Sequence, residues 1–165
     1  MGDREVGDDV SAIVRGVIDA EVVSVTSAGG LAVTDLDAER AVLAAILLDG
    51  DGAADVWRTV SSLLTARSFA DPRHALVFDC VAAIVARGQH VDVVTLGGEL
   101  TARRRLHTVG GAQWLGELTD GLPTLAHCET HARLVLAASV RRELGRRARE
   151  AQPDRAELPQ PDRAP

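Results

Sequence analysis

The stretch LDAERAVLAAILLD, residues 36–49, decides the fold of this chain. Its apolar residues recur at spacings of three and four, which is the periodicity of a helix with one buried face. They are Leu36, Val42, Leu43, Ile46 and Leu47. Two carboxylates fall in its first turn, where the positive end of the helix dipole favours them. The stretch therefore predicts an amphipathic helix, capped by Thr34 or Asp35, that ends at the glycine-rich turn after Asp49.

Three further helices have recognisable boundaries downstream. One is expected over about residues 53–65, with an apolar face. Asp71 then caps a helix whose first position is Pro72, where the missing N–H costs nothing. Gly88 suits the end of that helix, and Asp92 suits the cap of the next one.

The segment 110–150 completes the helical part. The Gly110-Gly111 turn leads into a short helix, and Thr124 opens the longest helix, which runs to about Glu150. The inner positions of this last helix are mainly small, and small residues three and four apart let another helix approach closely, in a helical hairpin or a dimer seam. These candidate interface residues are Leu125, Cys128, Ala132, Val135 and Ala138. The predicted fold class is all-α, a compact helical subdomain followed by a helical hairpin with a long last helix.

The two ends of the chain differ from its middle. Residues 1–33 are acidic and weakly patterned, so we expect an appendage that is partly disordered. Residues 151–165 repeat the pentapeptide Gln-Pro-Asp-Arg-Ala, and prolines at this density block helix formation, which predicts a disordered tail or linker. The domain prediction is therefore one folded unit, residues 34–150, between two tails.

Composition excludes several classes of function. The chain holds 18 Lys+Arg residues, all of them arginine, so it has neither the lysine of a phosphate-binding loop nor one for Schiff-base chemistry. We expect no catalytic residue and no cofactor. No apolar run reaches the 18 residues of a membrane span, and the acidic N-terminus is unlike a signal peptide. With only two cysteines, the sequence predicts a cytoplasmic protein with reduced thiols.

Arginines gather near the end of the last helix. Arg142, Arg146 and Arg149 share a face and could follow a phosphate backbone. The alternative is a solvated helix end, because cations are favourable at a helix C-terminus. The net charge of −6 argues against a dedicated nucleic-acid binder, so DNA contact is expected only indirectly, within a larger assembly.

The histidines of the chain could bind a metal ion or could have a structural role. His127 and His131 have the spacing of helical zinc ligands, but no third or fourth ligand lies nearby in sequence, so the sequence favours no metal. His74 precedes an apolar helix and is interpreted as a structural histidine with its hydrogen bonds satisfied.

Two carboxylate pairs could suggest acid–base catalysis. Asp37 and Glu39 lie at a helix start, and Asp49 and Asp51 lie at a glycine turn. Capping of the backbone explains both pairs, so we interpret them as structural.

Three blocks in fixed order resemble the N-terminal domain of DnaB-type bacterial replicative helicases. The first is residues 36–49, similar to that domain's opening "EAE-x-A-V-L" helix. The second runs from Phe69 through His74 to VDVVTL at 91–96, and the third contains Gly110-Gly111, Trp114-Leu115 and the Pro123-Thr124 turn. The resemblance covers about 115 positions. Ala44 replaces the usual glycine of the first block, and the ATPase motor of such helicases is missing.

The resemblance implies a non-catalytic oligomerisation and docking domain acting in DNA replication. Residues 36–105 would supply a globular part and residues 110–150 a hairpin that pairs. The implied partners are a second copy (dimer or hexamer), primase, and a helicase motor or loader, with ATP and Mg²⁺ confined to a separate motor domain. The chain would be a truncated or split helicase or a free-standing adaptor. The alternative is a helical metal- or ligand-binding enzyme unrelated to replication.

Overall fold

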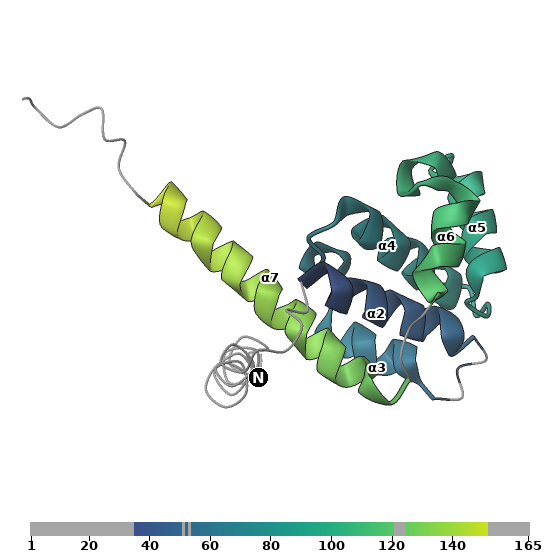
Figure 1. Cartoon of the computed structure of the whole chain (residues 1–165), viewed down its shortest axis with the longest axis horizontal. Helices are drawn as coiled ribbons and strands as arrows, with labels where there is room; N and C mark the ends of the chain where they lie inside the picture. Colours follow the sequence, from purple (N-terminus) through teal and green to yellow (C-terminus); the bar gives the residue numbers. More distant parts are fainter. Residues whose placement is uncertain (1–34, 51, 53, 121–124, 152–165) are drawn as a thin grey trace, which may run out of the picture.

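The computed structural model describes residues 35–50, 52, 54–120 and 125–151 (Figure 1). Those residues form helices and turns without a strand, which confirms the all-α prediction. The expectations for the acidic appendage, the Thr34 cap, Asp51 and the proline-rich tail after Ala151 fall outside the described residues. None of the described helices is long and apolar enough to cross a membrane.

The described elements follow one another with short connections. The α-helices are α2 (Asp35–Leu48), α3 (Val56–Leu63), α4 (Pro72–Ala86), α5 (Val93–Ala102), α6 (Gly111–Thr119) and α7 (Cys128–Glu150). Three short 3₁₀ turns join them: η1 (Ala66–Ser68), η2 (Leu106–Val109) and η3 (Leu125–His127).

Helix α2 lies at the centre of the body, with α3, α4, α6 and α7 packed around it (Figure 1). Almost every position from Ala38 to Leu47 is buried, Arg40 excepted. Four of the five predicted stripe residues, Val42, Leu43, Ile46 and Leu47, are buried as expected, whereas Leu36 is 45% exposed. Burial also extends beyond the stripe, because neighbouring helices cover the alanines of α2 as well. Ala44 is completely buried, so its small side chain suits the close approach of these neighbours.

The predicted boundaries of α4 and α5 are confirmed. The Asp71 carboxylate accepts a hydrogen bond from the Arg73 N–H (2.8 Å) ahead of Pro72 at the first position. Gly88 takes φ +68° where the chain leaves α4. Asp92 caps α5 by accepting from the Thr95 N–H at 2.7 Å.

Two helices begin later than predicted. Helix α3 starts at Val56 because Asp55 adopts a left-handed conformation (φ 54°), and it ends where Leu64 becomes extended. Helix α7 starts at Cys128, after the η3 turn, rather than at Thr124, which is not among the described residues.

We predicted a helical hairpin within residues 110–150, but α6 and α7 are not arranged as its two arms. Helix α6 packs against α2, α5 and η2, whereas α7 crosses α2 and α3 and touches η1. Figure 1 shows α6 and α7 at opposite sides of α2, with the final turns of α7 extending beyond the body. The long last helix is therefore present, but α6 is not the other arm of a hairpin with it.

Candidate interaction surfaces

Two buried carboxylates, one on α2 and one directly after it, hold the N-termini of other helices. Glu39 is completely buried and accepts hydrogen bonds from the backbone N–H groups of Ala70 (2.6 Å) and Asp71 (3.2 Å), just before α4. Its Oε2 also lies 2.8 Å from His74 Nδ1, whose N–H donates to it. Capping explains Glu39, as predicted, but the backbone groups that it caps precede α4 and lie across the core from its own helix.

Asp49, directly after the other end of α2, also caps the start of another helix. Its two carboxylate oxygens accept from the Ala54 N–H (2.8 Å) and the Val56 N–H (2.9 Å), at the start of α3. Capping explains Asp49, as predicted, although the capped helix is the next one. His74, only 2% exposed and bonded to Glu39, is confirmed as a structural histidine.

A polar cavity of about 280 Å³ opens between α2, α4 and α6, and we call it the Trp114 pocket. The Trp114 ring stacks on His74, with ring centroids 5.8 Å apart, and the Arg73 guanidinium lies 5.2 Å from the Trp114 ring centroid. Arg40 reaches across from α2 and donates to the Glu117 carbonyl at 2.9 Å. Exposed Leu36 adds an apolar edge to this lining.

Two of the charged residues that line the Trp114 pocket, Arg73 and Asp71, form an ion pair. The Arg73 guanidinium donates to the Asp71 carboxylate at 2.6 Å. This hydrogen bond is the main reason why the pKa of Asp71 lies below its usual value and that of Arg73 above it. The pocket therefore offers an aromatic face, an apolar edge and fixed charges of both signs, which suits a partner side chain better than a simple anion.

The small-residue face of α7 meets α2 and α3 of the same chain. Ala132, Val135 and Ala138 are at most 1% exposed, while Leu125 and Cys128 are half-buried at the edge of the core. The close helix approach is therefore made within the chain. These three buried side chains offer no surface to a second copy while the fold is intact, so the interface prediction for them is corrected.

The predicted phosphate-contacting arginines separate in the structure. Arg142 turns toward η1, where its Nη2 donates to the Ser68 carbonyl at 2.5 Å and its Nη1 is buried without a hydrogen-bond partner. Arg146 forms ion pairs with Glu143 (2.7 Å) and Glu150 (2.6 Å). Arg149 lies on the exposed last turn. They do not form one uninterrupted basic track.

The metal hypothesis gains no support within residues 35–50, 52, 54–120 and 125–151. The rings of His127 and His131 lie 6.4 Å apart, and no group of three His, Cys, Asp or Glu ligands occurs there. Burial and the neighbouring His127 lower the pKa of His131. Burial raises the pKa of both cysteines, Cys80 and Cys128, so their thiols are held in the protonated form.

Sequence reasoning did not find the Trp114 pocket, nor the buried contact between Glu39 and His74. Glu39 and His74 are 35 residues apart, and each has a sufficient local interpretation. The available signal was a carboxylate whose neighbours three and four residues further along the same helix face, Val42 and Leu43, are apolar. Such a carboxylate needs buried donors.

Comparison with known proteins gives a consistent result over this helical part. Residues 32–137 match the family described as "DnaB-like helicase N terminal domain". Replicative DNA helicase DnaB of Geobacillus stearothermophilus is 37% identical over 113 residues, which are 68% of this chain and 24% of that protein. The Mycobacterium leprae helicase of the same name is 36% identical over 110 residues, 67% of this chain and 18% of its own length.

A solved structure agrees with the sequence relatives. The N-terminal domain of DnaB helicase from Mycobacterium tuberculosis superimposes with a TM-score of 0.66 at 32% identity, covering 71% of this chain and 81% of that one. The chain thus spans about a quarter or less of the length of the curated helicases it matches.

Proposed function

The chain belongs to the DnaB-like helicase N-terminal domain family, and from that premise we propose that it is a non-catalytic module that self-associates and docks a primase or loader. It acts in cytoplasmic DNA replication. Any ATP and Mg²⁺ would be bound by a helicase motor domain and not by the residues of this helical module. Membership of this family removes the basis for an enzyme unrelated to replication.

The observation that carries the proposal is the outer face of α7. Opposite the buried residues, Val140, Leu144 and Ala148 follow one another every four residues, so they lie on one side of the helix. Leu144 is 57% exposed, and the final turns of α7 extend beyond the body (Figure 1). An apolar stripe on a helix is stabilised when a second helix covers it. Self-association through this stripe replaces the seam first expected at Ala132 and Ala138.

The Trp114 pocket supports the docking part of the proposal. Interface anchors are enriched in Trp and Arg, and here Trp114 and Arg73 are stacked and held by Asp71 and His74. The residues that line the pocket belong to α2, α4 and α6 and the turn before α4, and none of them belongs to α7. A partner bound there would leave the α7 stripe open to a second copy.

Light scattering across a range of concentrations tests self-association. The wild-type chain should form dimers or larger species, and Leu144→Glu should be monomeric, because burying a carboxylate in a helix seam is costly. Leu48→Glu is the matched control, since Leu48 has a similar exposure of 52% but lies on the body. A strictly monomeric wild type, or a Leu144→Glu variant of unchanged mass, contradicts the proposal.

Calorimetric titration with the helicase-binding domain of a bacterial primase tests docking. Arg40→Glu places a carboxylate in the Trp114 pocket and should weaken binding at least tenfold, whereas Arg67→Glu on η1 makes the same charge change elsewhere. Equal effects of the two substitutions, or an affinity untouched by Arg40→Glu, would refute this docking site.

A further inference from the structure

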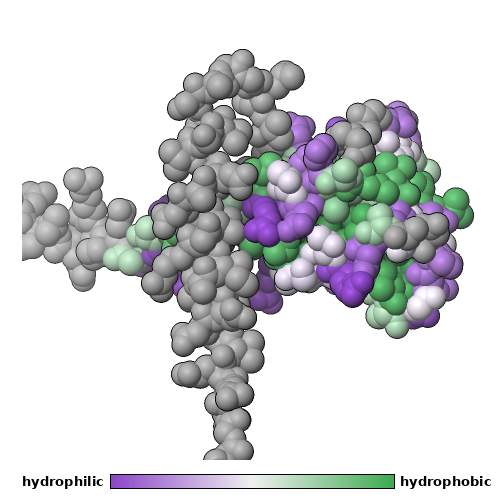
Figure 2. Space-filling view, turned by 90° about the horizontal axis from the view of Figure 1, so that it is seen from below, coloured by the Kyte–Doolittle hydropathy of each residue, from purple (hydrophilic) through white to green (hydrophobic). Residues whose placement is uncertain are grey.

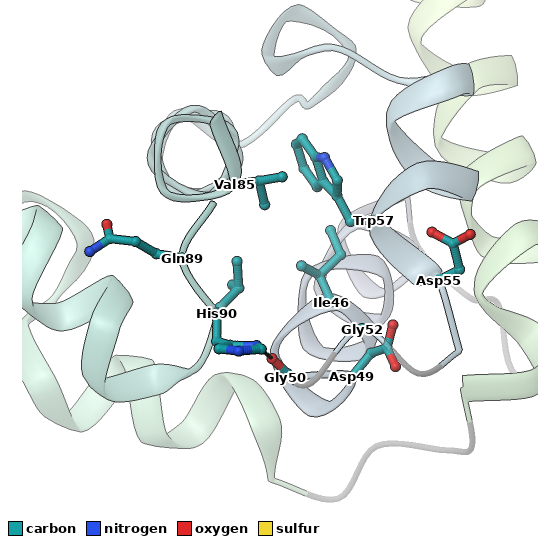
Figure 3. Close-up of a pocket in the computed structure, with 10 residues that line it drawn as sticks. Ile46, Asp49, Gly50, Gly52, Asp55, Trp57, Val85, Gln89 and His90 are labelled. Carbon is teal, nitrogen blue, oxygen red and sulfur yellow. Dashed lines mark hydrogen bonds between the residues drawn. The ribbon is translucent and has the colours of Figure 1, made fainter. Parts of the chain in front are cut away.

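A second cavity, of about 210 Å³, lies between the loop that joins α2 to α3 and the loop that joins α4 to α5. Figure 3 shows the side chains of Ile46, Trp57 and Val85 facing this space. The two loops hold each other closely: His90 Nδ1 lies 3.2 Å from the Gly50 carbonyl, to which its N–H donates. A side chain at position 50 would meet the Val91 carbonyl at 3.2 Å, so glycine permits this approach.

The walls of the cavity select an apolar occupant. Ile46, Trp57, Val85 and Val91 supply them, and the nearby Asp49 carboxylate already accepts two backbone hydrogen bonds. The volume is below the roughly 300–1,000 Å³ of typical cofactor sites, whereas a cavity of about 150 Å³ is enough to bind benzene. One aromatic ring or one branched aliphatic side chain therefore fits.

The rim of the cavity is acidic. Asp55 lines it with a side chain that is 45% exposed. Its ion-pair partner Arg58 leaves 82% of its own side chain in solvent, so a second cation can reach the same carboxylate. Exposed Asp92 follows Val91 on the other loop. Residues 35–140 as a whole hold 13 carboxylates against nine arginines, so the body attracts a basic partner.

Two exposed apolar side chains are close in sequence to the same two loops. Leu48, two residues before Gly50, is 52% exposed, and Val94, three residues after Val91, is 81% exposed. They account for two of the four large apolar side chains that are exposed among the described residues. A cavity for one side chain, bordered by apolar surface and carboxylates, matches the anchor-and-rim pattern of peptide-binding sites.

We propose that this cavity binds a peptide segment of a partner protein that inserts one large apolar side chain and presents basic residues to the rim at Asp55 and Asp92. The site is separate from the Trp114 pocket and from the α7 stripe, so it stands or falls independently of the proposed function.

Nuclear magnetic resonance of the ¹⁵N-labelled full chain tests the proposal through the indole N–H signals of its two tryptophans. The probe is the peptide acetyl-Arg-Arg-Leu-Arg-Arg-amide, compared with the same peptide carrying Glu in place of Arg and with one carrying Ala in place of Leu. The Trp57 signal should shift saturably with the first peptide. The Trp114 signal should stay in place, which provides an internal control. Loss of the buried leucine side chain should weaken binding about tenfold or more.

Two substitutions complete the test. Val85→Phe fills the cavity and should abolish the Trp57 shift. Asp55→Asn leaves the walls intact and should reduce the preference for the basic peptide over the acidic one. If Val85→Phe does not fold, Asp55→Asn and the three wild-type titrations decide. A Trp57 signal that stays fixed, responds equally to both charged peptides or is indifferent to Leu-to-Ala replacement overturns the proposal.

Discussion

Helix α2 and the last ten residues of α7 are held in helical form by different interactions. Helix α2 is covered by α3, α4, α6 and α7, and the buried carboxylates of Glu39 on α2 and of Asp49 directly after it accept hydrogen bonds from other elements. Within residues 141–150 of α7, Arg142 still donates to the Ser68 carbonyl of η1. The final turns extend from the body (Figure 1), and their side chains pair with one another: Arg146 with Glu143 and Glu150, and Arg147 with Glu143. Tertiary structure stabilises α2, whereas local ion pairs stabilise the end of α7, which leaves its surface free for a partner.

Figure 2 shows how hydrophobic and hydrophilic residues are distributed on one face of the molecule. The body presents hydrophobic groups interspersed with hydrophilic ones, and its apolar surface is continuous in places rather than scattered. Among the apolar side chains that remain exposed on the described surface, Leu36 lines the Trp114 pocket, while Leu48 and Val94 are close in sequence to residues that line the second cavity. Partner contact is therefore expected at the ends and edges of the helices, while the centre of the fold serves as a rigid support.

The largest predicted effect is that of Glu39→Ala. The substitution leaves the N–H groups of Ala70, Asp71 and His74 without their acceptor inside the core. Removing one partner of a buried polar cluster costs about 3–5 kcal/mol, a large part of the roughly 5–15 kcal/mol by which folded domains are stable. Urea unfolding monitored by circular dichroism measures it. The control Glu129→Ala removes an exposed ion pair with Arg133 and should change stability by about 0–1 kcal/mol.

If Glu39→Ala and Glu129→Ala destabilise the chain equally, Glu39 does not organise the core as the structure implies. His74→Ala offers an independent reading of the same cluster, because it removes only one of the three donors to Glu39. Its cost should be smaller than that of Glu39→Ala.

The next largest effect is a difference in stability between the same substitution in the inner and in the outer half of α7. Ala138→Leu adds volume where the side chain is 1% exposed against the core, and overpacking costs about 1–3 kcal/mol. Ala148→Leu makes the same change on an exposed turn and should be neutral within about 0.5 kcal/mol. Thermal unfolding of both variants measures the difference. A neutral Ala138→Leu would mean that the inner half of α7 separates readily from α2.

How much the sequence could predict depended on the range of the interactions. Asp71, Pro72 and Gly88 act on backbone groups within a few residues, so the boundaries of α4 followed from local rules. Asp92 and Thr95 likewise cap α5 between themselves. The family blocks then identified the arrangement, since they fix the order and spacing of these elements.

Long-range partners were not predictable in the same way. Periodicity showed that α7 has a face of small residues, but a stripe such as Ala132 and Ala138 fits α2 of the same chain as well as a second copy. Similarly, the cap that Glu39 provides to α4 spans about 31 residues, and no local pattern encodes it. The Trp114 pocket combines residues from three helices, so it could be found only after folding had brought them together.

A smaller effect is expected at the cap of α5. Asp92→Ala removes the acceptor of the Thr95 N–H and should cost about 1 kcal/mol. The same hydrogen bond is the main cause that lowers the pKa of Asp92 below its usual 3.8. The stabilisation is therefore fully present above about pH 4 and lost as pH falls through the lowered pKa. Urea unfolding at pH 7 and pH 3 should show a smaller acid-induced loss for Asp92→Ala than for wild type.

The smallest effect concerns the ion pairs at the end of α7. Hydrogen bonds from Arg146 and Arg147 lower the pKa of Glu143 to about 2. ¹³C resonance titration of its carboxyl group should give that midpoint in the wild type and the ordinary value near 4.5 in Arg146→Gln/Arg147→Gln. Because the pKa of Glu143 is depressed in the folded chain, the stabilisation from these ion pairs is present above the ordinary pKa and lost as pH falls toward 2.

In 1 M salt the wild-type titration midpoint of Glu143 should rise as well, since exposed charges are screened over about 3 Å. In the double variant and in 1 M salt, the helical chemical shifts of residues 141–150 should decrease while those of α2 stay unchanged, which would establish that the two helices depend on different interactions. If residues 141–150 keep their helical chemical shifts under both conditions, the rest of α7 is what stabilises the helix end.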